Sequence, residues 1–246
     1  MGGESAVRIA ALLPDVLGTY SDGGNVTVLA QRLRWRQIPV EICTVAAGDV
    51  PPADCDLYVL GGGEDGAQVF AADWLRRHSR LRATLEERAV TMVVCAGLQV
   101  LGRWMQDTAG RRHPGADVLD LTTKAGRRRA IGEVVSRCAI PGVGALTGFE
   151  NHRGVTTLGG GLLPLAEVVR GVGNGAGDHG DGVLTSTVVG TYLHGPVLAR
   201  NPALADAVLS RVTGRALPSL ELQDQEAVRR LRLGRSSVTR LRAARW

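Results

Sequence analysis

The chain has 246 residues, 44% hydrophobic and 22% charged, a composition typical of a folded globular protein and not of a disordered or fibrous one. Its formal net charge of +5 comes from the C-terminal part, because residues 200–246 hold 10 Arg and 4 Asp or Glu. Residues 1–199 hold 19 basic and 20 acidic groups. The body of the chain is therefore balanced in charge, which does not favour nucleic-acid binding. No run approaches the roughly 18 to 20 apolar residues of a membrane span and the N-terminal sequence lacks a signal-peptide pattern, so we expect a cytoplasmic protein without a transmembrane segment.

The first half of the chain alternates short apolar runs with stretches of helical period. The run at residues 90–94 is unbroken, as in a strand that is buried on both faces of a parallel sheet. This alternation predicts an α/β fold with a single doubly wound, mostly parallel sheet, helices on both faces, and functional sites at the carboxyl ends of the strands. The expected strands are 7–12, 40–45, 57–60 and 90–94, and the expected helices are 25–37 and 81–88.

After about residue 115 the pattern changes to short strands separated by glycine, with little helix until residues 202–213. We expect these strands to complete the sheet as antiparallel additions. The predicted organisation is one domain over residues 1–215 and a basic C-terminal extension over residues 216–246. That extension suits contact with a partner or an anionic surface, or it is a solvated end.

The segment Val93-Val94-Cys95-Ala96-Gly97-Leu98-Gln99 is typical of a nucleophile elbow. A buried strand ends at a cysteine, small residues follow, and the next stretch places Leu98, Leu101 and Met105 on one helical face. A thiol at the amino end of a helix is expected to have a lowered pKa. The alternative for Cys95 is a buried structural cysteine.

A second apolar run, residues 188–193, ends at His194. Two parallel strands that end in Cys and His can bring a thiol and an imidazole together, which is the arrangement that a thiol nucleophile needs. The other candidates are weaker. The four cysteines form no C-x-x-C pair, so no metal site is expected, and Lys124, the single lysine, lies outside any P-loop pattern.

These motifs together resemble the class I, triad-type glutamine amidotransferases of the cobyric acid synthase-like (CobB/CobQ) branch. The resemblance covers about residues 7–213, and the order of the motifs makes it specific. They are LGTYSDGGN at 17–25, GGGED at 61–65 with Gln68, the elbow, RAIGE at 129–133, GFENH at 148–152 with Thr156, GVGN at 171–174, and GTYLHGP at 190–196 with Asn201-Pro202.

The resemblance implies that Cys95 attacks the carboxamide of glutamine and that His194 transfers the protons. Backbone N–H groups of Ala96, Gly62 and Gly63 would stabilise the oxyanion. Arg129 would bind the α-carboxylate of the substrate, although the run Arg127–Arg129 could instead be a solvated loop. Gln99 is expected beside the substrate as a hydrogen-bonding residue.

The sequence departs from the family pattern at the third member of the triad. The position two residues after the histidine, often glutamate in class I enzymes, is Pro196 here. The acid must then come from elsewhere in the chain, with Asp22 and Glu150 as candidates, or from a partner, which the resemblance favours. Otherwise Asp22 and Asp65 would cap turns, and Glu150, Asn151 and His152 would have a structural or interface role.

The partners are also implied by the resemblance, which is strongest to glutaminase subunits that pair with a Mur ligase-like synthetase, MurT. Such a heterodimer amidates the D-glutamate of lipid II to D-isoglutamine in peptidoglycan synthesis, near the inner face of the membrane. L-Glutamine would be the substrate of this chain, no cofactor is expected in it, and ATP and Mg would bind to the partner. The alternatives are the glutaminase subunit of another amidotransferase, or a non-catalytic or oxidant-sensing thiol protein of related fold.

Overall fold

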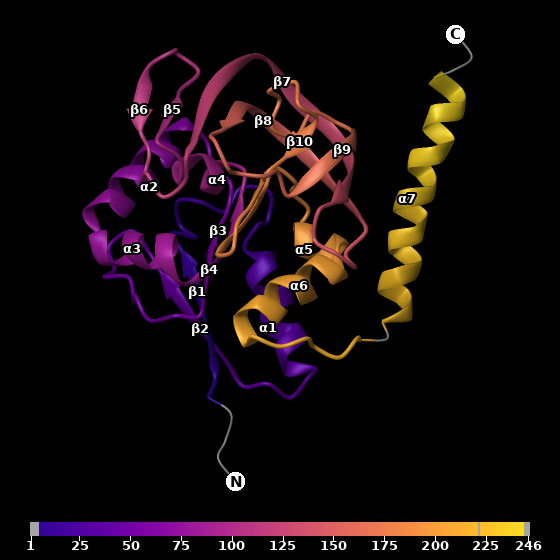
Figure 1. The fold of residues 1–246 in the computed structure, drawn as a ribbon, viewed down its shortest axis with the longest axis horizontal. Coiled ribbons are helices and arrows are strands. Elements are labelled where there is room, and N and C mark those ends of the chain that lie inside the picture. Colours follow the sequence, from indigo (N-terminus) through magenta and orange to yellow (C-terminus); the bar gives the residue numbers. More distant parts are fainter. Residues whose placement is uncertain (1–4, 221, 244–246) are drawn as a thin grey trace.

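The computed structural model describes residues 5–220 and 222–243, with side chains described as far as residue 234 (Figure 1). Within these residues a mostly parallel sheet has the strand order β11-β12-β4-β3-β1-β2, and only β11 is antiparallel to its neighbour. The predicted α/β class and the four predicted strands of the first half are confirmed. The strands are β1 (Val7–Leu12), β2 (Val40–Val45), β3 (Leu57–Leu60), β4 (Val90–Val94), β11 (Val183–Leu184) and β12 (Val188–Thr191).

The central strands β3, β4 and β12 are buried along their whole length, since helices cover both faces of the sheet. Figure 1 shows α2 and α3 on one side of the sheet and α1, α5 and α6 on the other. This layering leaves the carboxyl ends of the strands as the place where loops converge. The helices are α1 (Gly24–Arg34), α2 (Asp65–Arg77), α3 (Ser79–Glu87), α4 (Ala96–Val100), α5 (Val197–Arg200) and α6 (Pro202–Thr213).

The antiparallel strands of the second half form a separate sheet, with the order β10-β9-β7-β5-β6 and β8 paired to β7. The single continuous sheet expected from the sequence is thus corrected to two, because the long β7–β8 hairpin turns away from the first sheet. Backbone hydrogen bonds between Phe149 and His194 join the two sheets. The strands are β5 (Trp104–Gln106), β6 (Arg112–Pro114), β7 (Leu121–Cys138), β8 (Ala145–Leu158), β9 (Ala166–Arg170) and β10 (Gly180–Asp181).

The helices differ from the sequence prediction in three places. Helix α2 was not predicted, and α1 ends at Arg34 because Gln37 has a left-handed φ of 58°. Helix α4 stops at Val100 and Met105 lies in β5, so the expected longer helix after the elbow is wrong. Gly102 explains this turn, since a Cβ there would lie 2.4 Å from the Leu121 side chain.

A last helix, α7 (Gln223–Ala243), stands beside the body in Figure 1. Gln225 donates to the Ala199 carbonyl and Arg229 to the Arg200 carbonyl. Residues 221 and 244–246 of the proposed extension lie outside the described residues, and the division at residue 215 stays a prediction. Among the helices of the described ranges, none has the length and apolar character needed to cross a membrane.

Asn201, at the start of α6, fixes the segment behind His194 to β8. It is almost fully buried; its Oδ1 accepts from the Thr147 N–H at 2.9 Å, and its Nδ2 donates to the carbonyls of Thr147 at 2.7 Å and Val197 at 2.8 Å. A buried polar group that loses its hydrogen-bond partner is still removed from water, so the free-energy cost of its desolvation is no longer offset. The side-chain amide therefore couples the second sheet to the helices under the site.

We predict that Asn201→Ala lowers the free energy of unfolding by about 2 to 4 kcal/mol, because it leaves both backbone polar groups of Thr147 unpaired in the interior. Urea unfolding should show a lower midpoint with an unchanged slope. The exposed Thr27→Ala on α1 is the control and should change stability by less than about 0.5 kcal/mol. A loss below about 1 kcal/mol in the Asn201 variant would contradict this role.

Candidate active site

The nucleophile elbow predicted at Cys95 is present in the structure. Cys95 follows β4 directly and has φ 50° and ψ −106°, a region that non-glycine residues rarely occupy. Gly97 allows the close turn, since a Cβ there would lie 2.9 Å from both the Cβ and the carbonyl oxygen of Leu60. Such backbone strain is typical of functional sites.

The Cys95 thiol has a raised pKa, contrary to the prediction. Burial raises it to about 12, with a further contribution from the negative charge of Asp22, and the hydrogen bond from the Ala96 N–H opposes the shift only in part. Helix α4, at five residues, provides too small a field to outweigh the desolvation. The raised pKa favours the neutral thiol, which a base would have to deprotonate before Cys95 could act as a nucleophile.

His194 follows β12, the strand that pairs with β4 in parallel. Its side chain is fully buried, and its Nδ1 lies 3.0 and 3.1 Å from the two carboxylate oxygens of Asp22. Because a carboxylate only accepts, Nδ1 carries the proton and Nε2 is left as the basic nitrogen. Nε2 has no hydrogen-bond partner within the described ranges, so it is available as a base.

Gly62 lies between the histidine and the cysteine. A Cβ built on Gly62 would be 2.8 Å from His194 Cε1 and 3.5 Å from Cys95 Cβ, so both side chains lie against this glycine. Cys95 and His194 also line the same pocket. The structure therefore brings together the two residues that the sequence singled out.

Asp22 is the acid that sequence reasoning did not assign. It lies in the loop between β1 and α1, is 1% exposed, and accepts from the Gly62 N–H at 2.8 Å as well as from His194. A side chain of this chain thus lies where an acid was expected from a partner, and whether a partner also supplies an acid stays a prediction. The glycine-rich motif around Asp22 was the sequence feature that could have indicated this role. An aspartate that only caps a turn gives the same pattern, so the motif alone did not decide it.

The contact with Asp22 also corrects the expected oxyanion donors. The Gly62 N–H is committed to the carboxylate, and among the three expected donors only Gly63 lines the pocket. The Ala96 N–H points at the Cys95 thiol. The geometry is thus compatible with donors from Ala96 and Gly63, and not from Gly62.

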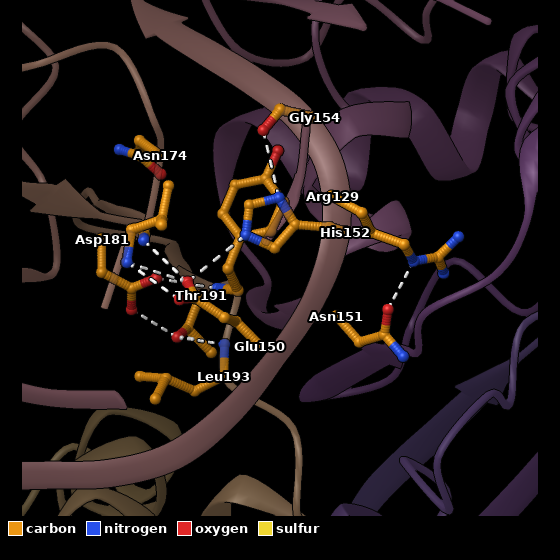
Figure 2. A network of polar contacts seen from close by, with 12 residues as sticks. Arg129, Glu150, Asn151, His152, Gly154, Asn174, Asp181, Thr191 and Leu193 are labelled. Carbon is orange, nitrogen blue, oxygen red and sulfur yellow. Dashed lines mark hydrogen bonds and ion pairs between the residues drawn. The ribbon is translucent and has the colours of Figure 1, made fainter. Parts of the chain in front are cut away.

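Arg129 lies at the mouth of the pocket. It comes from an irregular part of β7, between Ala125 and Ala130, where the pairing with β8 shifts. Its Nε donates to Asn151 Oδ1 at 2.5 Å, and Figure 2 shows the two side chains pointing toward each other. Of the three consecutive arginines, Arg129 lines the pocket and Arg127 and Arg128 do not, and binding of substrate by Arg129 stays a prediction.

Behind the pocket lies a buried polar network (Figure 2). Glu150 accepts from the N–H groups of Val172 and Gly173, and His152 packs against the Tyr192 ring with centroids 4.1 Å apart. Gln99 Nε2 donates to the Tyr192 hydroxyl at 2.9 Å. These contacts give Glu150 backbone partners within the protein, and binding of substrate by Gln99 stays a prediction.

Asp181 completes this network on the side away from Arg129 (Figure 2). Burial raises the pKa of its carboxyl to about 6, although the Thr191 hydroxyl and the Tyr192 N–H both donate to it. These two hydrogen bonds fix the end of β12 three residues before His194. In the part of the chain that the structure describes, no group of three or more His, Cys, Asp or Glu side chains is arranged to hold a metal ion.

Comparisons with known proteins agree with this geometry. Residues 8–202 match the CobB/CobQ-like glutamine amidotransferase domain family. The chain is 32% identical to the protein named lipid II isoglutaminyl synthase (glutamine-hydrolyzing) subunit GatD from Staphylococcus aureus, over 85% of each chain. It is 32% identical to the protein of the same name from Streptococcus pneumoniae, over 81% of this chain and 77% of that one.

More distant relatives share only part of their length or only the fold. A cobyric acid synthase from Sphingopyxis alaskensis is 29% identical over 70% of this chain but 35% of its own length. Among solved structures, one described as a glutamine amidotransferase matches with a TM-score of 0.57 at 19% identity, covering 83% of this chain and 98% of that one. The glutaminase domain of Trypanosoma brucei CTPS matches with a TM-score of 0.55 at 10% identity, covering 89% and 97%.

We predict that the Cys95 thiol of the folded chain is alkylated slowly, and that the alkylation rate keeps rising with pH without reaching a plateau. Only the thiolate reacts, and with the pKa raised to about 12 its fraction should grow about tenfold per pH unit between about pH 7 and 10. Iodoacetamide labelling of Cys95, followed by peptide mass spectrometry, measures this. In denaturant the same residue should level off near pH 9, and a plateau below pH 8 in the folded chain would reveal a thiolate–imidazolium pair instead.

Proposed function

The chain belongs to the CobB/CobQ-like glutamine amidotransferase family, and we propose that it is the glutaminase subunit of a lipid II isoglutaminyl synthase. The observation that carries the proposal is the buried line of three side chains at the strand ends: Asp22 against His194 Nδ1, His194 Nε2 without a partner in the described structure, and Cys95 in the same pocket. A thiol, a base and an acid that orients the base are the parts of a cysteine amide hydrolase.

The proposed reaction proceeds through a γ-glutamyl thioester. His194 Nε2 takes the proton of the Cys95 thiol as Sγ attacks the carboxamide carbon of glutamine, and the C–N double-bond character of the amide is lost. The N–H groups of Ala96 and Gly63 stabilise the oxyanion. The imidazolium returns its proton to the amide nitrogen, the C–N bond breaks, and ammonia leaves.

Hydrolysis of the thioester uses the same groups in reverse. His194 removes a proton from water, the resulting hydroxide attacks the thioester carbonyl, and the C–S bond breaks with return of the proton to Sγ. Glutamate is released and the enzyme is regenerated. Asp22 keeps the imidazole in the tautomer with basic Nε2 and stabilises the imidazolium in both halves of the reaction. Arg129 holds the substrate α-carboxylate, for which its guanidinium is a bidentate donor.

The names of the relatives support lipid II as the acceptor, and the partner is our inference from the resemblance. We assign the ammonia produced here to a MurT-like Mur ligase subunit that carries ATP and Mg and amidates the D-glutamate of lipid II. The two chains would form a heterodimer in the cytoplasm, near the inner face of the membrane. Support comes from the 85% mutual coverage with the S. aureus subunit.

A glutaminase subunit of another amidotransferase is the second candidate, favoured by the similarity to cobyric acid synthases. Against it, the chain spans about a third of those proteins, and its single lysine, Lys124, lies outside a P-loop pattern. Co-purification of the native partner distinguishes the two candidates. A non-catalytic or oxidant-sensing thiol protein would release no glutamate from glutamine with any partner present.

We predict that Cys95→Ala reduces glutamine-dependent amidation to background and leaves amidation with free ammonium intact, because the thiol acts only in producing ammonia. Both reactions should be followed in the complex with the synthetase subunit. Cys43→Ala, which removes a thiol from strand β2, is the control and should retain both. Glutamate release by the Cys95 variant would exclude the thioester mechanism.

We further predict that Asp22→Asn lowers kcat for glutamine hydrolysis by about 10²- to 10⁴-fold with little change in KM, since the amide no longer fixes the reactive tautomer of His194. Steady-state glutamate release measures both constants. Asp15→Asn, in the same loop but exposed and bonded to the Ala47 N–H, is the matched control. Activity within about threefold of the unmodified chain would mean that another acid orients the histidine.

A further inference from the structure

The mouth of the pocket pairs one cation with one anion from different parts of the fold. Arg129 comes from β7 and Glu64 from the residue before α2, and Arg129 Nη2 lies 3.3 Å from Glu64 Oε1. Both side chains line the pocket that contains Cys95, and both charges act on the pKa of its thiol, Glu64 raising it and Arg129 lowering it. The ion pair is thus part of the site.

Stability does not account for this ion pair. The Arg129 side chain is 38% exposed and that of Glu64 is 70% exposed, and exposed pairs of this kind contribute little to folding. Glu64 also makes no side-chain cap to helix α2, although it occupies the N-cap position. The exposed Glu64 carboxylate, whose ion pair with Arg129 adds little to stability, can exchange this partner for a charged group of a ligand.

The other charged groups around the pocket are committed to the protein. Asp65, the other acid of the lining, accepts from the N–H and the hydroxyl of Thr108 at 2.9 and 2.7 Å. Asp22 is bound to His194 and Gly62. Arg153, the other arginine of the lining, donates to the Gly126 carbonyl. Among the described pocket residues this leaves Glu64 and Arg129 as the pair of opposite charges.

We propose that Glu64 binds the α-ammonium group of the substrate, while Arg129 binds its α-carboxylate. This inference rests on the proposed function and specifies how its substrate is recognised. An α-amino acid carries both charges on one carbon, so its recognition needs an anion and a cation side by side. On binding, each protein charge exchanges its protein partner for a substrate partner, and no charge is left uncompensated at the mouth.

The arrangement also determines which amides are substrates. Glutaramate has the carboxamide and the distal carboxylate of glutamine but lacks the amino group, so it satisfies Arg129 and not Glu64. L-Glutamine should therefore be preferred over glutaramate, and this preference should depend on Glu64 alone. Because the ammonium lies away from the carboxamide, its loss should act on KM more than on kcat.

The experiment compares kcat/KM for L-glutamine and glutaramate in the full-length chain with its synthetase subunit. For Glu64→Ala we expect the KM for L-glutamine to rise about 10- to 150-fold, the range for a charged hydrogen bond, with glutaramate hydrolysis unchanged. Arg129→Ala should impair both substrates, since both carry the carboxylate. Asp73→Ala, which removes an exposed acid from the same helix α2, is the charge control and should alter neither.

Two results would overturn the inference. If Glu64→Ala impaired L-glutamine and glutaramate equally, Glu64 would act by orienting Arg129 and not by binding the ammonium group. If the variant kept the preference for L-glutamine, Glu64 would have no part in recognition. Both results presuppose that the unmodified chain hydrolyses L-glutamine; if it did not, the proposed function would fail first and this inference with it.

Discussion

The hydrogen bond between His194 Nδ1 and the Asp22 carboxylate is the contact around which the site is organised. Asp22 lies after β1 and His194 after β12, so the contact joins two strand ends from opposite halves of the chain. The same carboxylate holds the Gly62 N–H and thereby fixes the loop after β3 beside Cys95. The Asp22 carboxylate accepts from an imidazole N–H and a backbone N–H, so one aspartate with satisfied oxygens orders three loops.

A raised thiol pKa has a functional meaning in this setting. Because burial raises the pKa of Cys95, the unliganded site favours the neutral thiol, the form that reacts slowly with oxidants and electrophiles. Under the proposed mechanism, reactivity depends on transfer of this proton to a histidine that Asp22 orients, so the nucleophile would be generated during the reaction.

The sequence predicted the parts of the site that follow directly from strand ends. Cys95 and His194 each end an apolar run, and parallel pairing of those runs brings their ends together. Asp22 could not be assigned, because it reaches the histidine only through the path of the loop between β1 and α1. Gly62 was misassigned as an oxyanion donor for a related reason: the direction of a backbone N–H depends on which side chain accepts it.

In the fold, too, the features set by local sequence pattern were predicted, and those set by tertiary contacts were not. The buried parallel strands could be predicted from the apolar runs in the first half of the sequence. The second sheet was not predicted as separate, because the residue pattern of a strand does not say which sheet the strand joins; that depends on pairings such as those of β7 with β5, β8 and β9. Helix α4 was predicted too long because the contact of Gly102 with Leu121 cannot be seen in the apolar pattern around Leu98 and Met105.

The backbone pairing of Phe149 with His194 links the two sheets beside the candidate active site. The Phe149 N–H and carbonyl bond the carbonyl and N–H of His194, and β8 also carries Asn151, which holds Arg129. The hairpin and the histidine main chain therefore cannot shift independently. The hairpin therefore joins the main chain of His194 and, through Asn151, the side chain of Arg129 in one hydrogen-bonded unit.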